Sequence, residues 1–308
     1  MTGQNPLIGF IGQGFIGKNY ADDFERRGYS VIRYALEEPY RANKDRIKDC
    51  DIVFVAVPTP TTVKGFDDSI VRAAISIIAP ASIVVVKSTL APGTTKVLQQ
   101  DFPDLVILHS PEFLREATAA YDAAHPERNI IGVACETDSH ITAAKRVLEV
   151  LPQASYTLVC SAREAEYIKY AGNAFLFLKV VFANLLYDAT AADGCDWELI
   201  RQALGADSRI GPSHLGVLHA SGHPNAPLGR GAGGHCFIKD FASLRAHYEK
   251  VLPHDADGIA VLRAFEEKNK ALLKTTNKDL DLLAGVYGDT ESSRLDIIQT
   301  KISSNVSG

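Results

Sequence analysis

A short apolar run, residues 7–11, is followed at once by Gly12-Gln13-Gly14-Phe15-Ile16-Gly17, which has the pattern G-x-G-x-x-G. The apolar run predicts a strand, and the stretch from this pattern through Arg27 predicts a helix. Glycines at these three positions permit a tight turn, let a ligand approach the backbone and let the helix pack on the strand. Amide groups at the start of such a helix bind pyrophosphate. The segment predicts an α/β domain that binds a dinucleotide. The alternative is a glycine turn that binds nothing.

Further apolar runs at regular intervals predict the remaining strands of a sheet, rich in β-branched residues as in parallel sheets that are covered on both faces. They occupy residues 29–34, 51–57, 82–87, 105–109, 130–134 and 155–160. Polar segments at 58–60, 88–95 and 110–116 follow three of these strands. Ligands bind beyond the carboxyl ends of strands in open α/β sheets. We therefore expect these segments to line a binding site.

The end of the second predicted strand bears on the choice of cofactor. Dinucleotide-binding domains place an acidic residue there, which accepts hydrogen bonds from the adenosine ribose. This chain has Ala35 at the expected position and Glu37 shortly after it. Glu37 is the candidate for the ribose contact and favours NAD. The nearby Arg33 leaves NADP open.

The composition changes after Ser161, and residues 163–192 contain no proline and no strand-like run. Apolar residues at helical spacing predict one long helix there, with Glu166, Lys169 and Asn173 near one face. Charged residues beside an apolar stripe are also typical of a solvated helix surface. More helices are expected at 69–78, 197–204, 241–251 and 257 to about 283. The predicted fold is α/β, with an N-terminal Rossmann-type parallel sheet followed by a long helix and an all-α central domain.

The predicted domain boundaries follow from this pattern. Residues 1–162 form a Rossmann-type domain, and residues 163–287 form a helical central domain that includes dimer contacts and a cysteine-bearing loop. Residues 288–308 form a tail that is rich in Ser, Thr and Asp.

Four glycines lead to Cys236 in the segment Gly229-Arg230-Gly231-Ala232-Gly233-Gly234-His235-Cys236. Glycines let a loop approach a ligand closely, and a nearby cation favours a reactive thiolate. Lys239 and Asp240 supply a cation and a proton acceptor at short spacing. A surface loop with an inert cysteine fits the segment equally well.

The overall composition excludes several classes of function. A net charge of -5 and a pI near 6.0 give no basic footprint for nucleic acid. Strongly apolar runs such as 83–86 are too short to cross a bilayer, and a signal peptide is not expected. Five scattered cysteines without a CxxC pair indicate neither a disulfide framework nor a metal site. A cytoplasmic protein without a metal is expected.

Seven segments, in order along the chain, carry a resemblance to one family. They are GQGFIG, VAVPTP, KSTLAPGTT, SPEFLREATA, EYIKYAGNAFLFLKVVFAN, DSRIG and GRGAGGHCFIKD. With them the chain resembles the UDP-glucose/GDP-mannose (nucleotide-sugar) dehydrogenases as far as roughly residue 270. The resemblance implies an oxidation of a sugar's primary alcohol to a carboxylate, by two hydride transfers to NAD. We expect UDP-glucose as substrate, UDP-glucuronate as product, and a homodimer through the helix at 163–192.

The resemblance also implies roles for individual residues. Cys236 would be the nucleophile that forms a thiohemiacetal and then a thioester. Lys169 and Asn173 would hold the alcohol and the oxyanion, and Asp240, Glu112 and Thr89 would manage the hydrolytic water. Further substrate contacts are expected from Phe113, Leu114, Arg209, Gly233 and Lys239. The cofactor contacts are expected from Gly12, Gly14, Phe15, Ile16, Gly17, Glu37, Val57, Pro58, Thr59, Thr89 and Glu116.

Members of this family carry a third domain that grips the nucleotide part of the substrate, and the sequence predicts a short form without it. Two alternatives stay open at this point. One is a β-hydroxyacid-type dehydrogenase with a single hydride transfer, which needs no thiol. The other is a truncated, non-catalytic dinucleotide-binding subunit.

Overall fold

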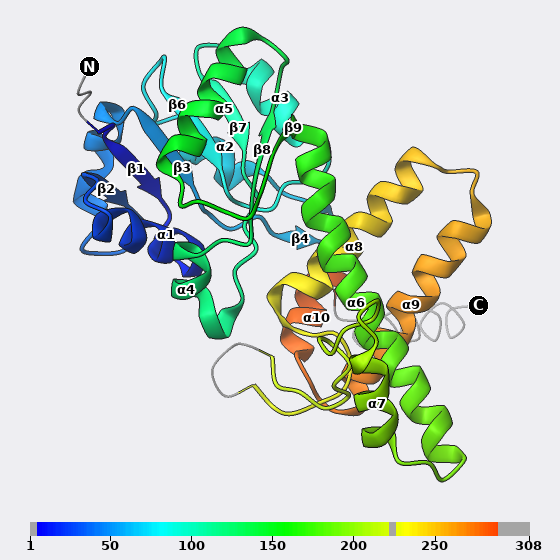
Figure 1. Ribbon diagram of the computed structural model, residues 1–308. Coiled ribbons are helices and arrows are strands. Elements are labelled where there is room, and N and C mark those ends of the chain that lie inside the picture. The colour runs from blue at the N-terminus through cyan, green and yellow to red at the C-terminus, as the bar shows by residue number, and fades with distance from the viewer. Residues whose placement is uncertain (1–4, 222–225, 289–308) are drawn as a thin grey trace, which may run out of the picture. The chain divides into compact units, whose positions relative to one another are not determined.

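The computed structural model describes residues 5–221 and 226–288 (Figure 1). These residues form two compact units. The first unit comprises Met1–Pro60 and Asp67–Ala171, and the second comprises Thr61–Phe66 and Gly172–Gly308. The expected domain boundaries stay a prediction. The expected tail lies outside the described residues, apart from Gly288.

The first unit contains a seven-stranded sheet in the order β2-β1-β3-β6-β7-β8-β9 (Figure 1). Its strands are β1 Ile8–Ile11, β2 Val31–Tyr34, β3 Ile52–Val55, β6 Ile83–Val86, β7 Val106–His109, β8 Arg128–Val133 and β9 Tyr156–Ser161. All seven lie at the predicted positions, and neighbours pair in parallel except β7 and β8. That antiparallel pair departs from the expected parallel sheet. Parallel strands need a crossover connection, usually a helix, and β7 and β8 are joined only by a loop, a short turn and the six-residue α4.

Helices cover the sheet on both faces. The first face packs against α1 Phe15–Arg26, α4 Ala119–Ala124 and α5 Asp138–Val150, around stacked rings of Phe10 and Phe54 whose centroids lie 4.9 Å apart. The alternate strand residues, such as Val53, point to the other face, where α2 Ser69–Ile75 and α3 Thr94–Asp101 lie. The short 3-10 segments are Arg41–Asp49 and Glu116–Thr118. α3, α4 and α5 were not among the predicted elements.

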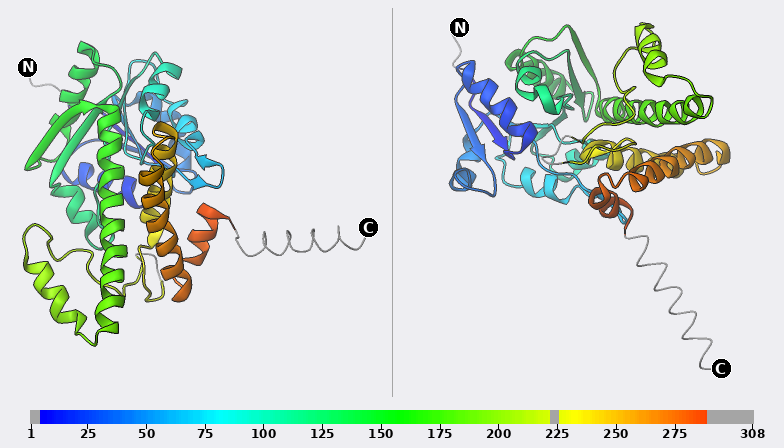
Figure 2. Two further views of the ribbon diagram at one scale, coloured as in Figure 1. Left: turned by 90° about the vertical axis from the view of Figure 1, so that its right-hand side faces the viewer. Right: turned by 90° about the horizontal axis from the view of Figure 1, so that it is seen from below.

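The second unit is built from helices and one small hairpin. The predicted long helix is confirmed as α6 Ala162–Ala192, whose last part lies in this unit with α7 Trp197–Ala206, α8 Gly234–Val251, α9 Ala256–Thr275 and α10 Leu280–Tyr287. α9 runs beside the C-terminal part of α6 (Figure 2). Phe177 of α6 stacks on Phe241 of α8 at 3.9 Å between ring centroids. The hairpin of β4 Thr61–Thr62 and β5 Gly65–Phe66 contacts α8.

Two helix boundaries differ from the prediction. α8 begins at Gly234, so Cys236 lies in the first turn of a helix and not in a loop. The expected helix from 257 to about 283 is interrupted, because Asn277 and Asp279 both adopt left-handed backbone with φ of 52°. Local propensity predicts a loop for the glycines before Cys236 and a continuous helix through Asp279, and contacts with residues elsewhere in the unit override both preferences.

By length and composition alone, α6 could span a bilayer, and no other helix of the described residues meets that test. A third of its most apolar window, 33%, is buried inside the protein. Its buried polar residues have protein partners: Lys169 Nζ donates to Glu112, and Arg230 donates to the Asn184 side chain. These contacts are typical of a core helix, because polar groups buried in protein need hydrogen-bond partners.

Candidate active site

The three glycines of the first motif have different spatial surroundings. Gly12 has φ of +92°, and a Cβ there would lie 2.2 Å from the carbonyl oxygen of Ala56. A Cβ on Gly17 would lie 1.9 Å from the carbonyl oxygen of Gly12, so the helix can approach β1 only without a side chain. A Cβ on Gly14, at the start of α1, would meet nothing within 4 Å. The first and third glycines are therefore required by the fold, and the second leaves open space at a helix N-terminus, as a pyrophosphate site needs.

The residues beyond β2 match the expected contact with the adenosine ribose only in part. Glu37 is exposed, and Ala35 is buried. The guanidinium of Arg33 is occupied by carboxylates of α1, at 2.7 Å from Asp22 and 2.7 Å from Glu25. An arginine already held by two carboxylates is a poor partner for a 2′-phosphate. The Arg33 side chain is therefore already paired within the first unit.

Ser88 joins the ends of β3 and β6, a role that the sequence analysis missed. Its Oγ accepts from the amide of Val57 at 3.0 Å and donates to the carbonyl of Val57 at 2.7 Å. The neighbouring threonines, Thr59 and Thr89, are both buried at this edge. Among the other expected cofactor residues, Phe15, Pro58 and Glu116 are exposed, and Ile16 packs against the core.

The loop after β7 carries a buried ion pair. Lys169 Nζ donates to Glu112 at 2.8 Å, both to its carboxylate Oε1 and to its backbone carbonyl. Both side chains are about 7% exposed. The same ammonium lies 5.7 Å from the ring centre of Phe113, whose ring is also covered by the Arg128 guanidinium at 3.7 Å. The next residue, Leu114, packs against the core. Lys169 and Glu112 were expected in one site, and the fold of the first unit brings them into contact.

Glu166 has a structural role that its place near Lys169 on one helix face did not reveal. The carboxylate is fully buried and accepts hydrogen bonds from the amides of Gly93 and Thr95 and from the Thr95 hydroxyl. These amides lie at the start of α3, where helical N–H groups have no partner of their own. Glu166 therefore fixes the loop that follows β6.

Two buried bases lie at the ends of β6 and β7. Lys87 Nζ donates to the Ser110 hydroxyl at 3.0 Å and to the Ser110 carbonyl at 3.1 Å, and lies 4.4 Å from the ring centre of Tyr20. Burial lowers the pKa of Lys87 to about 7, with the Glu112 charge opposing and the Lys169 charge adding to this effect. Burial likewise lowers the pKa of His109 to about 3. The loop that carries Glu112 therefore begins at Ser110, which accepts both hydrogen bonds from Lys87.

Replacing this lysine should change how stability depends on pH. In the unfolded chain a lysine keeps its proton up to about pH 10, whereas folded Lys87 loses it near pH 7. Folding therefore releases a proton between these values, so this group makes the wild-type protein more stable as pH rises from 7. We expect the free energy of unfolding of wild type relative to Lys87→Met to rise by at most about 1.4 kcal/mol per pH unit.

Urea unfolding of both proteins at pH 7 and pH 9 measures this difference. Lys96→Met, at an exposed position of α3, is the control and should show a constant difference from wild type. A constant difference for Lys87→Met as well would show that Lys87 is charged in the folded protein throughout this range.

The second unit groups Cys236 with three of the other expected residues. Cys236 is exposed in the first turn of α8, and Asp240 follows one turn later on the same face. The buried Asp240 carboxylate accepts from Asn173 Nδ2 at 2.6 Å and pairs with Lys239 Nζ at 2.6 Å. The positive end of a helix dipole favours the anionic form of a thiol placed there.

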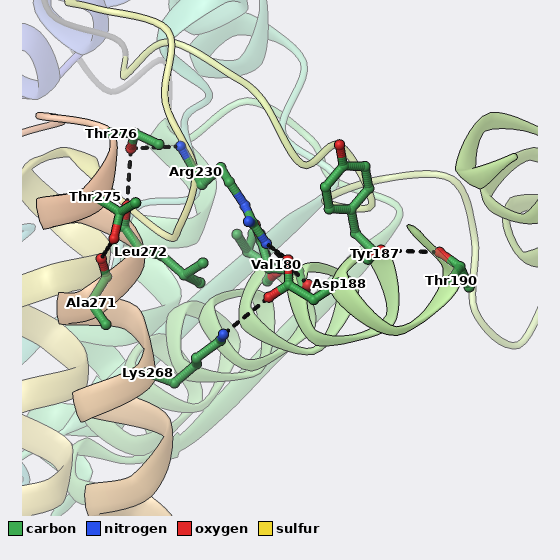
Figure 3. Close-up of polar contacts among 11 residues, drawn as sticks. Val180, Tyr187, Asp188, Thr190, Arg230, Lys268, Ala271, Leu272, Thr275 and Thr276 are labelled. Carbon is green, nitrogen blue, oxygen red and sulfur yellow. Dashed lines mark hydrogen bonds and ion pairs between the residues drawn. The ribbon is translucent and has the colours of Figure 1, made fainter. Parts of the chain in front are cut away.

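Arg230, which lies between two glycines before Cys236, was not predicted to have a role. Its guanidinium donates to Asn184 at 2.8 Å and to Asp188 at 2.6 Å, and Lys268 of α9 pairs with the same aspartate (Figure 3). Its backbone amide donates to Thr276. The sign of this role in the sequence is a charged side chain within a glycine-rich segment. This network ties the segment before α8 to α6 and α9.

The other expected substrate residues lie at different parts of the second unit. The Arg209 side chain is 87% exposed and pairs with its neighbour Asp207 at 2.6 Å. Gly233 is the N-cap of α8 and has no room for a side chain, because a Cβ would lie 2.0 Å from Asp279. Among residues 5–221 and 226–288, no three His, Cys, Asp or Glu side chains gather as a metal site would require.

The comparisons with known proteins agree with these features. Residues 36–151 match the NAD binding domain of the UDP-glucose/GDP-mannose dehydrogenase family, and residues 163–271 match the central domain of the same family. The UDP-glucose 6-dehydrogenase of Pseudomonas aeruginosa is 32% identical over 249 residues, which are 76% of this chain and 52% of that protein. The chain thus spans about half the length of this curated relative.

Solved structures give the same result. A UDP-glucose dehydrogenase from Pyrobaculum islandicum has a TM-score of 0.73 and 28% identity, over 88% of this chain and 69% of that one. The 3-hydroxyisobutyrate dehydrogenase of Mycobacterium tuberculosis shares the fold at a TM-score of 0.65 but only 14% identity, over 92% of this chain and 99% of that one. The match to an NAD binding domain and the open space at Gly14 indicate a nicotinamide dinucleotide cofactor.

Two consecutive domains of one family match in order, and the glycine motif, the buried Lys169–Glu112 pair and the cysteine at the start of α8 occur within or beside them. This chain belongs to the UDP-glucose/GDP-mannose dehydrogenase family.

Proposed function

We propose that this protein is an NAD-dependent nucleotide-sugar 6-dehydrogenase that oxidises UDP-glucose to UDP-glucuronate. The observation that carries the proposal is the arrangement in the second unit. A cysteine lies in the first turn of α8, and a buried aspartate one turn later is held by Asn173 and Lys239. A thiol beside polar groups that can hold oxygen suits covalent oxidation of an aldehyde. A single oxidation of an alcohol needs no such thiol.

The residues of this chain would divide the work as follows. The cofactor, held at Gly12, Gly14 and Gly17, supplies a hydride acceptor. Loss of hydride from the alcohol carbon requires loss of the hydroxyl proton, which Lys169 and Asn173 would assist by binding the oxygen. The thiol of Cys236 would then add to the aldehyde carbon, giving a thiohemiacetal. Loss of a second hydride from that carbon, to a second molecule of NAD, together with loss of the hydroxyl proton leaves a thioester.

Hydrolysis would return the enzyme to its starting state. Water attacks the thioester carbon, the carbon–sulfur bond breaks, and the products are a carboxylate and the free thiol. Asp240, Glu112 and Thr89 would order and deprotonate this water. The Lys169 ammonium would stabilise the negative charge on the substrate oxygen in each tetrahedral species. The direct contact of Glu112 with Lys169 supports a shared task for these two residues.

The remaining roles follow from the family. Phe113, Leu114, Gly233, Lys239 and Arg209 would contact the substrate, with Arg209 reaching into a neighbouring subunit. We propose a cytoplasmic location, since reactive thiols persist in reducing compartments. The β-hydroxyacid alternative is supported by the shared fold alone. The non-catalytic alternative gives no reason for a buried Lys169–Glu112 pair, because burying two charges carries a desolvation cost.

We also propose that the protein is a homodimer through α6. One face of this helix presents Phe175, Leu178, Phe182 and Leu185 at alternating spacings of three and four residues, and Phe175 and Phe182 are 68% and 54% exposed. Such a stripe is typical of helices that pair with another helix. We expect Phe182→Glu to shift the protein from dimer to monomer in analytical ultracentrifugation, and Val97→Glu on exposed α3 to leave it unchanged. A wild-type protein that sediments as one chain would contradict the proposal.

The proposed reaction is tested by incubating the protein with NAD and a panel of nucleotide sugars, and by counting NADH formed per sugar consumed. Oxidation to the acid gives two NADH per sugar, and a simple alcohol dehydrogenase gives one. The panel identifies the sugar and the base. No NADH with any nucleotide sugar, from a protein that binds NADH, would favour the non-catalytic alternative.

A further inference from the structure

The turn between α9 and α10 contains two buried charges to which the proposed reaction assigns no role. Lys278 has no exposed surface, and Asp279 is 3% exposed. Ionised side chains are rarely buried unless their polar atoms find partners, because desolvation of a charge is costly. Both residues lie beyond residue 271, where the match to the central domain ends. Their partners therefore show what this turn does.

Both charges are directed at the segment that leads into α8, here called the glycine segment and defined as Gly229–Gly234. Lys278 Nζ donates to the carbonyl of Gly231 at 3.0 Å. Asp279 Oδ2 accepts from the amide of Gly234 at 2.8 Å and from the Ser221 hydroxyl. The first amides of a helix need external acceptors, and Gly233 at the N-cap of α8 has no side chain to serve as one. Asp279 thus caps α8 from another helix.

Two further residues of the same region complete the attachment. The side chain of Asn269 in α9 forms two hydrogen bonds with the backbone of Ala232. It accepts from the amide at 2.7 Å and donates to the carbonyl at 2.9 Å. The Thr276 hydroxyl accepts from the amide of Arg230 at 3.0 Å, as Figure 3 shows. The glycine segment is therefore bound at successive residues by side chains of α9 and of the α9–α10 turn.

The space around the glycines agrees with this attachment. A Cβ on Gly233 would lie 2.0 Å from Asp279 Oδ2, and a Cβ on Gly229 would lie 2.7 Å from the Lys278 Cβ. Gly231, with φ of +88°, would place a Cβ 2.9 Å from Asn269 Oδ1. These glycines are required because the attaching side chains occupy the space that a larger residue would need.

We propose that Lys278 and Asp279 are positioning residues for Cys236. Cys236 follows the capped amide of Gly234 by two residues, so the turn that holds Gly234 also fixes the place and direction of the first turn of α8. Asn269 and Thr276 hold the rest of the glycine segment in the matching conformation. This inference rests on the proposed function only in giving Cys236 a catalytic task. The attachment itself would exist in a protein of any activity.

Two variants of Asp279 separate positioning from a simple effect of charge. Asp279→Asn removes the negative charge but keeps a side-chain oxygen that can accept from the amide of Gly234. Asp279→Ala removes both. Loss of a nearby anion alone would favour the thiolate of Cys236 and speed its alkylation in both variants. Loss of the cap would free the first turn of α8 and weaken the contribution of the helix end to the thiolate.

The test is the rate at which iodoacetamide alkylates Cys236, followed by peptide mass spectrometry on the full chain between pH 6 and 9. At pH 7 we expect Cys236 in Asp279→Asn to react at least as fast as in wild type. In Asp279→Ala we expect it to react at least about fivefold more slowly than in wild type. The exposed Cys195 is an internal control and should react equally in all proteins. Asp281→Ala, at an exposed position of α10, is the matched control variant and should resemble wild type.

Rates that rise together in both Asp279 variants, or that equal wild type in both, would overturn the proposal. If Asp279→Ala does not fold, Lys278→Met decides the question, because it keeps the apolar stem and removes only the ammonium that holds Gly231. A normal Cys236 rate in folded Lys278→Met would then count against positioning, and a slower rate would support it. The assay uses neither NAD nor a sugar, so its outcome is independent of whether the proposed reaction occurs.

Discussion

Cys236→Ser is expected to lose carboxylate formation almost completely, by at least about a thousandfold. A serine hydroxyl at this position is far less nucleophilic than a thiolate, so the aldehyde cannot be held covalently for the second hydride transfer. The first hydride transfer does not use the thiol. We therefore expect the NADH formed per sugar to fall from two towards one, with aldehyde or its hydrate as the product. Carboxylate by mass spectrometry and NADH by absorbance measure the two quantities.

Two controls accompany this variant. Cys195→Ser changes another exposed cysteine of the second unit and should leave both quantities at wild-type values. Binding of NADH, measured by its fluorescence, should be the same in Cys236→Ser and wild type, because the proposed cofactor residues belong to the first unit and Cys236 to the second. Undiminished carboxylate production by Cys236→Ser would exclude a thioester route and leave oxidation through a free aldehyde hydrate.

Substitutions at two glycines of the first motif should separate an effect on folding from an effect on cofactor binding. Gly17→Ala places a Cβ 1.9 Å from the backbone oxygen of Gly12, which cannot move without separating α1 from β1. We expect the free energy of unfolding to fall by about 3 kcal/mol. Gly14→Ala meets nothing within 4 Å, and its φ of -73° suits alanine, so stability should be unchanged. The added methyl would instead occupy the open space before α1 and weaken NADH binding about tenfold to a hundredfold.

Thermal unfolding and titration of NADH fluorescence distinguish the two variants. Gly285→Ala, in α10 with nothing within 4 Å of its Cβ, is a matched control that should change neither cofactor affinity nor the fold. Full NADH affinity in Gly14→Ala would mean that no dinucleotide phosphate approaches this backbone. A Gly17→Ala protein as stable as wild type would mean that the contact between α1 and β1 is looser than the structure describes.

Much of the fold could be predicted from the order of residues because its signals are local. The strands β3 and β6 are continuous apolar runs, the other strands of the sheet contain shorter ones, and α6 is a long stretch of helical periodicity without proline. The glycines at 12, 14 and 17 define a turn through their own backbone freedom and through neighbours a few residues away. The antiparallel β7–β8 pair and the helices α3, α4 and α5 lacked an equally clear local signal. The start of α8 was misplaced because its cap, Asp279, lies 45 residues away from Gly234.

The sequence by itself therefore determined the dinucleotide-binding turn, the order of the strands along the chain and the identity of the reactive residue types. Only the tertiary structure decided which polar groups meet: Lys169 with Glu112 across 57 residues, Glu166 with Thr95 across 71, and Asn173 with Asp240 across 67. The physical reason is that secondary structure follows from steric and hydrogen-bonding preferences of neighbouring residues. The partner of a buried charge is instead chosen by packing, since every such group must find a donor or acceptor wherever the folded chain places one.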